Sequence, residues 1–227
     1  MKHVAVRNSV RADEKLISIL REAGTSTVHE AMGRVGLLQP YIRPIYVGAE
    51  ATGSAVTVLA QPGDNWMLHV AVELCRPGDM LVVACTAPNT DGLFGELLAT
   101  SLRARGVVGL VIDAGCRDIK ALRAMAFPVW SKAISAKGSV KATLGAVNVP
   151  VVCAGALVHP GDVIVADEDG VAVVPCAEVS AVAEASQARL AKEEKNRARL
   201  AAGELGLDIY TMRPALAAAG LVYVDRE

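Results

Sequence analysis

Blocks of apolar and polar positions in the middle of the chain predict a strand, a helix and a second strand. Met80 to Cys85 is an almost wholly apolar run with β-branched residues, as is typical of a buried strand. Glu96 to Arg105 carries apolar residues at helical spacing, and Gly106 ends it. Val107 to Ile112 repeats the strand pattern. We therefore expect two parallel strands joined by a helix.

The loops after the two predicted strands carry the candidate chemistry. Gly92 and Gly95 bracket the first loop, and Arg117 and Asp118 lie in the second. A right-handed crossover opens both loops on one edge of the sheet, where such sheets commonly bind ligands. Amides at the helix start suit an anion, the arginine can hold an oxyanion, and the aspartate is a hard ligand for a metal. The alternative is a salt-bridged turn without function.

Regular elements are also predicted on both sides of this unit. An amphipathic helix is expected from Ala12 to Ala23, where Gly24 ends it. Thr25, Ser26 or Thr27 can cap a second short helix that runs through Met32 and carries His29 and Glu30. Further predictions are a strand region between Val47 and Gln61, helices from Met67 to Cys75 and from Asp118 to Met125, and strands at residues 128–130 and 149–152.

Turn signals divide the rest of the chain. Pro-Gly-Asp triplets begin at Pro62, Pro77 and Pro160, and we interpret them as turns, although the first can also line a cleft. Residues 163–166 and 171–174 flank an acidic turn, which is a hairpin pattern. That turn can bind a cation, but it lacks the ligand spacing of a calcium loop, so a solvated turn is expected.

A long helix is predicted from Ala177 to about Ala202, polar in its second half and ended by Gly203. An apolar tail that includes Tyr210 follows it. A terminal helix and tail of this kind favour packing on a neighbouring subunit, so a homo-oligomer is expected.

Composition narrows the class of protein. The chain has 227 residues, 52% of them hydrophobic but only 4% aromatic, which suits an α/β fold in one domain over residues 1–227. A net charge of −1 argues against nucleic acid or an anionic membrane as a partner. No run of about 18 apolar residues is present, and the start lacks a secretory signal pattern, so a cytoplasmic location is expected.

Several other chemistries find little support. The sequence has no GxSxG, HExxH, GxGxxG or GxxxxGK[ST] motif. Five cysteines without a CxxC pair are interpreted as reduced thiols, with a reactive Cys116 as the alternative. We interpret His29 and Glu30 as packing and capping residues in preference to a general acid and base. A Schiff-base role is weakly supported for three lysines, which are Lys132, Lys137 and Lys141.

Four stretches carry a resemblance to a known family: DGLFGELLATSLRARGVVGLVIDAGCRD, STVHEAMGR, PGDNW and RARLAAGELGLDIY. They resemble the 4-hydroxy-4-methyl-2-oxoglutarate and 4-carboxy-4-hydroxy-2-oxoadipate aldolases over nearly the whole chain. The wider superfamily includes the regulator of ribonuclease activity A proteins, which inhibit an RNA-degrading enzyme without lyase chemistry. The resemblance implies a swivelling β/β/α fold, and a trimer or dimer of trimers with active sites between subunits. Residues 177–227 would then contact a neighbour.

The resemblance also implies roles for single residues. Gly95, Glu96, Leu97 and Leu98 match the pyruvate-binding backbone, with the two leucine amides on the pyruvyl carboxylate. Arg117 matches the catalytic and substrate-binding arginine, and Asp118 the metal-binding aspartate. Glu193 best matches a glutamate that a neighbouring subunit contributes, because it keeps the family spacing to Arg197 and Leu200, although Glu194 is adjacent.

The implied reaction is cleavage of a 4-hydroxy-2-oxo diacid to pyruvate. A divalent ion on Asp118, expected to be Mg²⁺ or Mn²⁺, and Arg117 would stabilise the enolate. No side chain is an obvious base, so we expect a water or hydroxide on the metal, oriented by Glu193 and Glu96. Oxaloacetate decarboxylation is expected as a side activity. The alternative function is that of a ribonuclease-regulating binding protein without lyase activity.

Overall fold

A computed structural model of the protein describes residues 3–226. The chain divides after Ser186 into two units, residues 3–186 and 187–226. The first unit contains a nine-stranded sheet and the helices that cover it. The second contains most of the last long helix and two short ones. A single domain over residues 1–227 stays a prediction.

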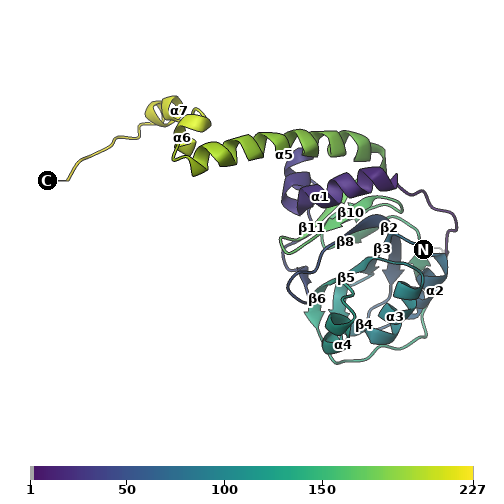
Figure 1. The fold of residues 1–227 in the computed structure, drawn as a ribbon. Coiled ribbons are helices and arrows are strands. Elements are labelled where there is room, and N and C mark those ends of the chain that lie inside the picture. The colour runs from purple at the N-terminus through teal and green to yellow at the C-terminus, as the bar shows by residue number, and fades with distance from the viewer. Residues whose placement is uncertain (1–2, 227) are drawn as a thin grey trace. The chain divides into compact units, whose positions relative to one another are not determined.

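Four parallel strands form the centre of the sheet (Figure 1). They are β2 (Ala51–Ala60), β3 (Asp79–Cys85), β5 (Gly109–Cys116) and β6 (Val129–Ile134). The predicted parallel pairing of the two strands around the helix is confirmed, because β3 pairs in parallel with β5. The second strand begins and ends later than expected, since its last residues Gly115 and Cys116 continue to pair with β6. An α/β fold with a long C-terminal helix is therefore confirmed.

The outer strands run in mixed directions. Antiparallel pairing joins β1 (Arg43–Pro44) to β6, β7 (Ala146–Val147) and β10 (Val163–Ala166) to β2, and β11 (Val171–Val174) to β10. The predicted hairpin is confirmed with its bounds. The strand β2 begins later than the pattern suggested. The two-residue strands β1 and β7 were not predicted, because so short a run has no periodicity.

The predicted loop between Gly92 and Gly95 is wrong in part, because Gly92–Phe94 forms a short strand, β4. β3 pairs with the first half of β5, and β4 pairs in parallel with its last residues, on the same side of β5 as β3. A Cβ atom on residue 115 would lie 2.3 Å from the carbonyl oxygen of Thr90. Glycine at that position therefore permits the close approach, which brings the start of the next helix beside the end of β5.

Helices cover one face of the sheet (Figure 1). They are α2 (Trp66–Leu74), α3 (Glu96–Ala104) and α4 (Ile119–Ala124), and all three match predicted helices closely. Each inserts fully buried side chains, such as Leu68, Leu102 and Leu122, into one core with the sheet. A second core lies around Trp130 and the hairpin of β8 (Val151–Cys153) and β9 (Ala156–Val158).

The first helix, α1 (Glu14–Ala31), is interrupted at Gly24, where φ is 76°. The break was predicted, but the expected cap from the side chain of Thr25, Ser26 or Thr27 was wrong, because acceptors from another segment take that place. The amide of Thr25 donates to Asp167 Oδ2 at 2.8 Å, and the Ser26 hydroxyl donates to Asp169 Oδ2 at 2.8 Å. The acidic hairpin turn therefore supplies the cap for the second part of α1.

All three Pro-Gly-Asp triplets form turns, with φ between 73° and 91° at the glycine. Each aspartate is buried and accepts backbone hydrogen bonds. Asp79 accepts from Arg76 N at 2.7 Å and Asp162 from His159 N at 2.8 Å. The triplets are thus built around buried carboxylates, a feature that turn propensity alone does not indicate.

The predicted C-terminal helix is confirmed as α5 (Val179–Ala201), preceded by a short 3₁₀ turn at Cys176–Glu178. In the second unit α6 (Gly206–Ile209) and α7 (Arg213–Ala218) follow. Packing of this unit on a neighbouring subunit stays a prediction. Among the described residues, no helix has both the length and the apolar character needed to cross a membrane.

All five cysteines are free thiols, as expected. Cys116 is fully buried, and this burial raises the pKa of its thiol. A raised pKa disfavours the thiolate at neutral pH, so the alternative of a reactive Cys116 is not supported.

Candidate functional site

The first turn of α3 presents backbone amides that have no acceptor among residues 3–226. The carbonyl of Leu93, which would otherwise receive the Leu97 amide, accepts from Asn65 Nδ2 at 2.9 Å. The carbonyl of Phe94, which lies four residues before Leu98, accepts from Arg117 N at 2.9 Å. Within the described residues, the amides of Leu97 and Leu98 therefore remain available to a ligand. The helix start adds a partial positive charge that favours an anion.

The end of β5 places Arg117 and Asp118 beside this turn. Asp118 adopts a left-handed conformation, with φ 60° and ψ 34°, and so turns the chain from β5 into α4. Its Oδ2 accepts a hydrogen bond from Glu96 N at 3.1 Å and lies 3.7 Å from Arg117 Nε. Both side chains remain nearly half exposed. The four predicted backbone positions and these two side chains are thus brought together.

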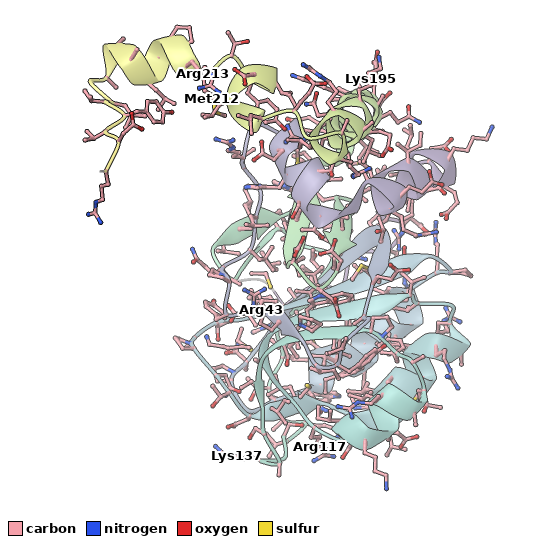
Figure 2. The ribbon with its side chains drawn as sticks, turned by 60° about the vertical axis from the view of Figure 1, so that its left-hand side comes forward. Arg43, Arg117, Lys137, Lys195, Met212 and Arg213 are labelled. Atoms are coloured by element: carbon pink, nitrogen blue, oxygen red, sulfur yellow. The ribbon has the colours of Figure 1, made fainter. Side chains whose placement is uncertain are left out.

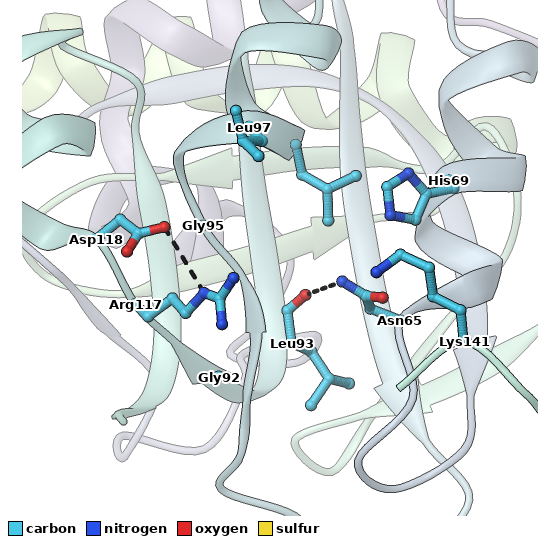
Figure 3. A pocket seen from close by; sticks show the side chains of 10 residues that line it. Asn65, His69, Gly92, Leu93, Gly95, Leu97, Arg117, Asp118 and Lys141 are labelled. Atoms are coloured by element: carbon cyan, nitrogen blue, oxygen red, sulfur yellow. Dashed lines mark hydrogen bonds and ion pairs between the residues drawn. The ribbon is translucent and has the colours of Figure 1, made fainter. Parts of the chain in front are cut away.

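A cavity of about 120 Å³ opens between these groups (Figure 3). Its lining residues are Asn65, His69, Gly92, Leu93, Gly95, Leu97, Leu98, Arg117, Asp118 and Lys141. Five of them were not predicted as site residues: Asn65, His69, Gly92, Leu93 and Lys141. The PGDNW stretch was the signal for Asn65, because its loop was recognised as able to line a cleft. Glu96 lies beside the cavity and is not among its lining residues.

The segment after β6 closes one side of the cavity. Gly92 N donates to Lys137 O at 2.8 Å, and a Cβ atom on residue 138 would lie 3.2 Å from Arg117 Nη1. Figure 2 shows Arg117 and Lys137 at the same end of the molecule. Lys137 itself pairs with Asp91 at 3.0 Å. The segment therefore lies against the arginine.

Among the described residues, Asp118 is the only carboxylate residue that lines the cavity. No group of three or more His, Cys, Asp or Glu side chains suited to a metal occurs among residues 3–226. This donor set fits Mg²⁺ or Mn²⁺, which bind through one or two carboxylates and take their other oxygens from water and substrate. It does not fit a closed zinc site, which needs about four protein ligands.

Glu193 belongs to the second unit, in the polar half of α5. Its Oε1 lies 2.8 Å from Arg189 Nε one helical turn earlier, and Glu194 pairs with Arg197. The two glutamates thus have different partners on the helix. A role for Glu193 in a neighbouring subunit's site stays a prediction.

Residues 25–173 match the family model described as RraA-like, Aldolase/RraA. The chain belongs to this RraA-like family. The matched region spans the sheet, the three covering helices and all ten residues that line the cavity. The family assignment expected from the sequence is therefore confirmed.

The names of similar proteins refer to two different functions, an aldolase and an inhibitor of a ribonuclease. A protein of Halalkalibacterium halodurans, named "Putative 4-hydroxy-4-methyl-2-oxoglutarate aldolase", is 28% identical over 88% of this chain and 95% of its own length. The solved Streptomyces coelicolor RraAS2, titled an unusual member of the RNase ES inhibitor RraA family, is 26% identical with a TM-score of 0.74, covering 84% of this chain and 99% of its own. An uncharacterised Pseudomonas syringae protein shares the fold, at 23% identity and a TM-score of 0.77, covering 86% and 96%.

Proposed function

We propose that the protein is a metal-dependent pyruvate aldolase. Its substrates are 4-carboxy-4-hydroxy-2-oxoadipate, which gives pyruvate and oxaloacetate, and 4-hydroxy-4-methyl-2-oxoglutarate, which gives two pyruvates. The observation that carries the proposal is that the free amides of Leu97 and Leu98, the Arg117 guanidinium and the Asp118 carboxylate meet at one cavity. The name of the H. halodurans relative supports the same class of reaction.

The bond between C3 and C4 of the substrate breaks in this reaction. Its electron pair forms the enolate of pyruvate, while the C4 hydroxyl loses its proton and becomes a carbonyl. The enolate then takes a proton at C3 and leaves as pyruvate. Negative charge thus grows on the former 2-keto oxygen, and a catalyst must hold fixed positive charge at that atom.

The described residues can supply binding and charge. The amides of Leu97 and Leu98 bind the C1 carboxylate, and the dipole of α3 favours its charge. Arg117 donates to the 2-keto oxygen and binds it more strongly as the oxygen becomes an enolate. The hydrogen bond from Glu96 N keeps Asp118 oriented toward the same place. Asp118 would hold a divalent ion, which would supply Lewis-acid stabilisation of the enolate charge.

Proton removal from the 4-hydroxyl is assigned to a water molecule. Glu193 of a neighbouring subunit and Glu96 orient that water in the proposed trimer or dimer of trimers. Exposed apolar side chains support contact between subunits. Leu97, at the cavity, is 79% exposed, and Val152 and Leu157 of the β8–β9 hairpin are 62% and 55% exposed.

A coupled assay for pyruvate tests the proposal. We expect pyruvate release from both diacids, and from oxaloacetate as a side reaction, with Mg²⁺ or Mn²⁺ present. Excess EDTA should abolish release, and added metal should restore it. The proposal would be contradicted if the protein released pyruvate from none of the three substrates.

A second candidate is regulation of a ribonuclease, which the similarity to the S. coelicolor protein favours. RNA cleavage by a ribonuclease of the RNase ES type, measured with and without the purified protein, separates the two functions. Inhibition at stoichiometric concentration without pyruvate release would identify a regulator. Pyruvate release without inhibition would identify an aldolase.

A further inference from the structure

Strand β5 changes neighbours shortly before it reaches the candidate site. β3 pairs with β5 up to Ile112, and β4 pairs with it on the same side from Gly115 on. The pairing with β6, on the other side, shifts its register between the same two residues. Such irregularities bend a strand and are common beside active sites. The bend at residues 113–114 therefore sets where Arg117 and Asp118 lie.

One charged side chain, that of Asp113, stands at this bend. Every other residue of β5 is buried. The carboxylate lies on the face of the sheet away from the covering helices, because Val111, two residues earlier, packs in the second core. Its side chain is 19% exposed. A carboxylate that is largely removed from water lowers stability unless hydrogen-bond donors and an opposite charge surround it.

Three separate segments supply partners for Asp113. The Tyr41 hydroxyl, in the loop before β1, donates to Oδ1 at 3.2 Å. Lys132 Nζ, on β6, lies 3.2 Å from the same oxygen and 5.0 Å from the centre of the Tyr41 ring. The amide of Ala154, in the turn between β8 and β9, donates to Oδ2 at 3.1 Å. Asp113 therefore joins the bend in β5 to a loop, a neighbouring strand and a hairpin.

The two neutral donors keep their hydrogen bonds at pH 7. Burial, and next the charge of Asp113, raise the pKa of Tyr41 to about 12, so the hydroxyl is protonated and can donate. Ala154 is buried, and its carbonyl oxygen accepts from Gln39 N at 2.9 Å. A protonated phenol and a fixed amide thus bind the carboxylate together with the ammonium group of Lys132.

We propose that Asp113 is a positioning residue for Arg117 and Asp118. By binding three segments on one face of the sheet, it holds the point at which β5 changes neighbours. The last residues of the strand then come to lie beside the start of α3. This inference rests on the proposed aldolase function, because it assigns an indirect role in that site. Asp113 does not line the cavity and acts through the strand.

Substitutions in this cluster test the role by kinetics. For Asp113→Asn we expect kcat/KM for pyruvate release to fall about 10- to 100-fold, mainly through kcat, because the groups that stabilise the enolate are displaced. Lys132→Arg keeps the ion pair and should retain most activity. Tyr41→Phe removes one hydrogen bond and should lower kcat/KM about 2- to 10-fold, which keeps the test decisive if Asp113→Asn does not fold.

Amide hydrogen exchange reports on the end of β5 without substrate or metal. The amides of Gly115 and Arg117 donate to Asp91 O at 3.0 Å and to Phe94 O at 2.9 Å. In Asp113→Asn both should exchange about 10-fold faster, because this end of the strand opens more easily when the bend is not held.

Arg11→Met is the matched control for stability. Arg11 Nε lies 2.7 Å from Asp79 Oδ1 at the first residue of β3, and the Asp79 side chain is 1% exposed. Loss of this ion pair should lower the free energy of unfolding. It should leave kcat/KM and the exchange of the two β5 amides unchanged, because the candidate site lies at the opposite ends of the parallel strands.

A double-mutant cycle separates positioning from a general loss of stability. Asp113→Asn should lower kcat/KM less in an Arg117→Ala background than in the unmodified protein, because one displaced group is then already absent. Equal effects in both backgrounds, or unchanged exchange of the β5 amides in Asp113→Asn, would overturn the inference alone. Absence of pyruvate release by the unmodified protein would overturn the proposed function, and amide exchange would still decide whether Asp113 holds the strand end.

Discussion

Gly95 and Asp118 lie so close together that a Cβ atom on residue 95 would stand 2.3 Å from Asp118 Oδ2. The same atom would lie 3.1 Å from Arg117 Cγ. The space between the helix start and the candidate metal ligand is therefore too small for any side chain. Gly95 permits this contact, and its backbone is extended, so a left-handed conformation is not the reason for glycine here.

Gly95→Ala should displace Asp118 and Arg117 from the helix start. We expect kcat/KM for pyruvate release to fall about 10- to 100-fold, because small displacements at a reacting centre have effects of that size. Gly206→Ala is the control for stability, since its Cβ would have an ordinary contact of 3.6 Å with Tyr210. Unchanged kcat/KM in Gly95→Ala would show that the close contact has no part in the reaction.

Arg117→Lys should lower turnover by about 10²-fold or more, because an ammonium cannot reproduce the forked geometry of the guanidinium. The free energy of unfolding should change by less than about 1 kcal/mol, since the Arg117–Asp118 pair is half exposed. Steady-state kinetics and urea unfolding measure the two effects. Arg123→Lys, an exposed position on α4, is the control. Turnover near that of the unmodified protein would exclude Arg117 from the reaction.

Asp118→Asn should remove activity that added Mg²⁺ or Mn²⁺ cannot restore, because an amide is a weaker metal ligand than a carboxylate. Thermal unfolding of the unmodified protein should be nearly the same with and without EDTA, since no three-donor site occurs in the described residues. Calorimetry with and without chelator checks the second point. A large loss of stability in EDTA would indicate a structural metal site instead.

Asp64→Asn tests the carboxylate that positions His69 and Lys141. Burial alone would raise the pKa of Asp64, but hydrogen bonds from the amides of Trp66, Ala142 and Thr143 outweigh it, so the pKa is lowered. The substitution should cost about 1–3 kcal/mol at pH 7, because an amide cannot accept all three bonds. Urea unfolding measures this loss.

The lowered pKa of Asp64 also sets a pH dependence. The stabilisation is fully present above the ordinary aspartate pKa of about 3.9 and is lost as pH falls through the lower folded value. We therefore expect the unfolding free energy to fall below about pH 4, and to fall less steeply in Asp64→Asn. Equal slopes in the two proteins between pH 4 and pH 2.5 would contradict this assignment.

Glu193→Gln should lower turnover about 10- to 100-fold if its carboxylate orients water in a neighbouring site, and Glu194→Gln should have little effect. Mixed oligomers test more directly than the single substitutions whether two subunits share a site. Arg117→Ala and Glu193→Gln subunits each have lowered activity in the proposal, but a mixture refolded together should recover activity at sites that combine intact residues. No recovery on mixing would argue against sites shared between subunits.

The sequence by itself determined the local elements around the site. Helix α3 and strands β3 and β5 follow from apolar spacing and a terminal glycine, which are properties of neighbouring residues. The parallel crossover then places Arg117 and Asp118 beside residue 95. The longest of the four stretches that resemble the RraA-like family covers these same elements, so this part of the site was predictable.

Only the tertiary structure determined which residues form the cavity wall across from Arg117 and Asp118. His69 and Lys141 are more than seventy positions apart, and no periodicity links them. Asp64 brings them together by accepting amides from both segments, and hydrogen bonds between distant segments leave no local pattern in a sequence. The short strand β4 also depends on pairing between distant segments and has no local pattern in the sequence. It exists because β3 ends before β5 does, and the exposed edge of β5 pairs with the chain that follows.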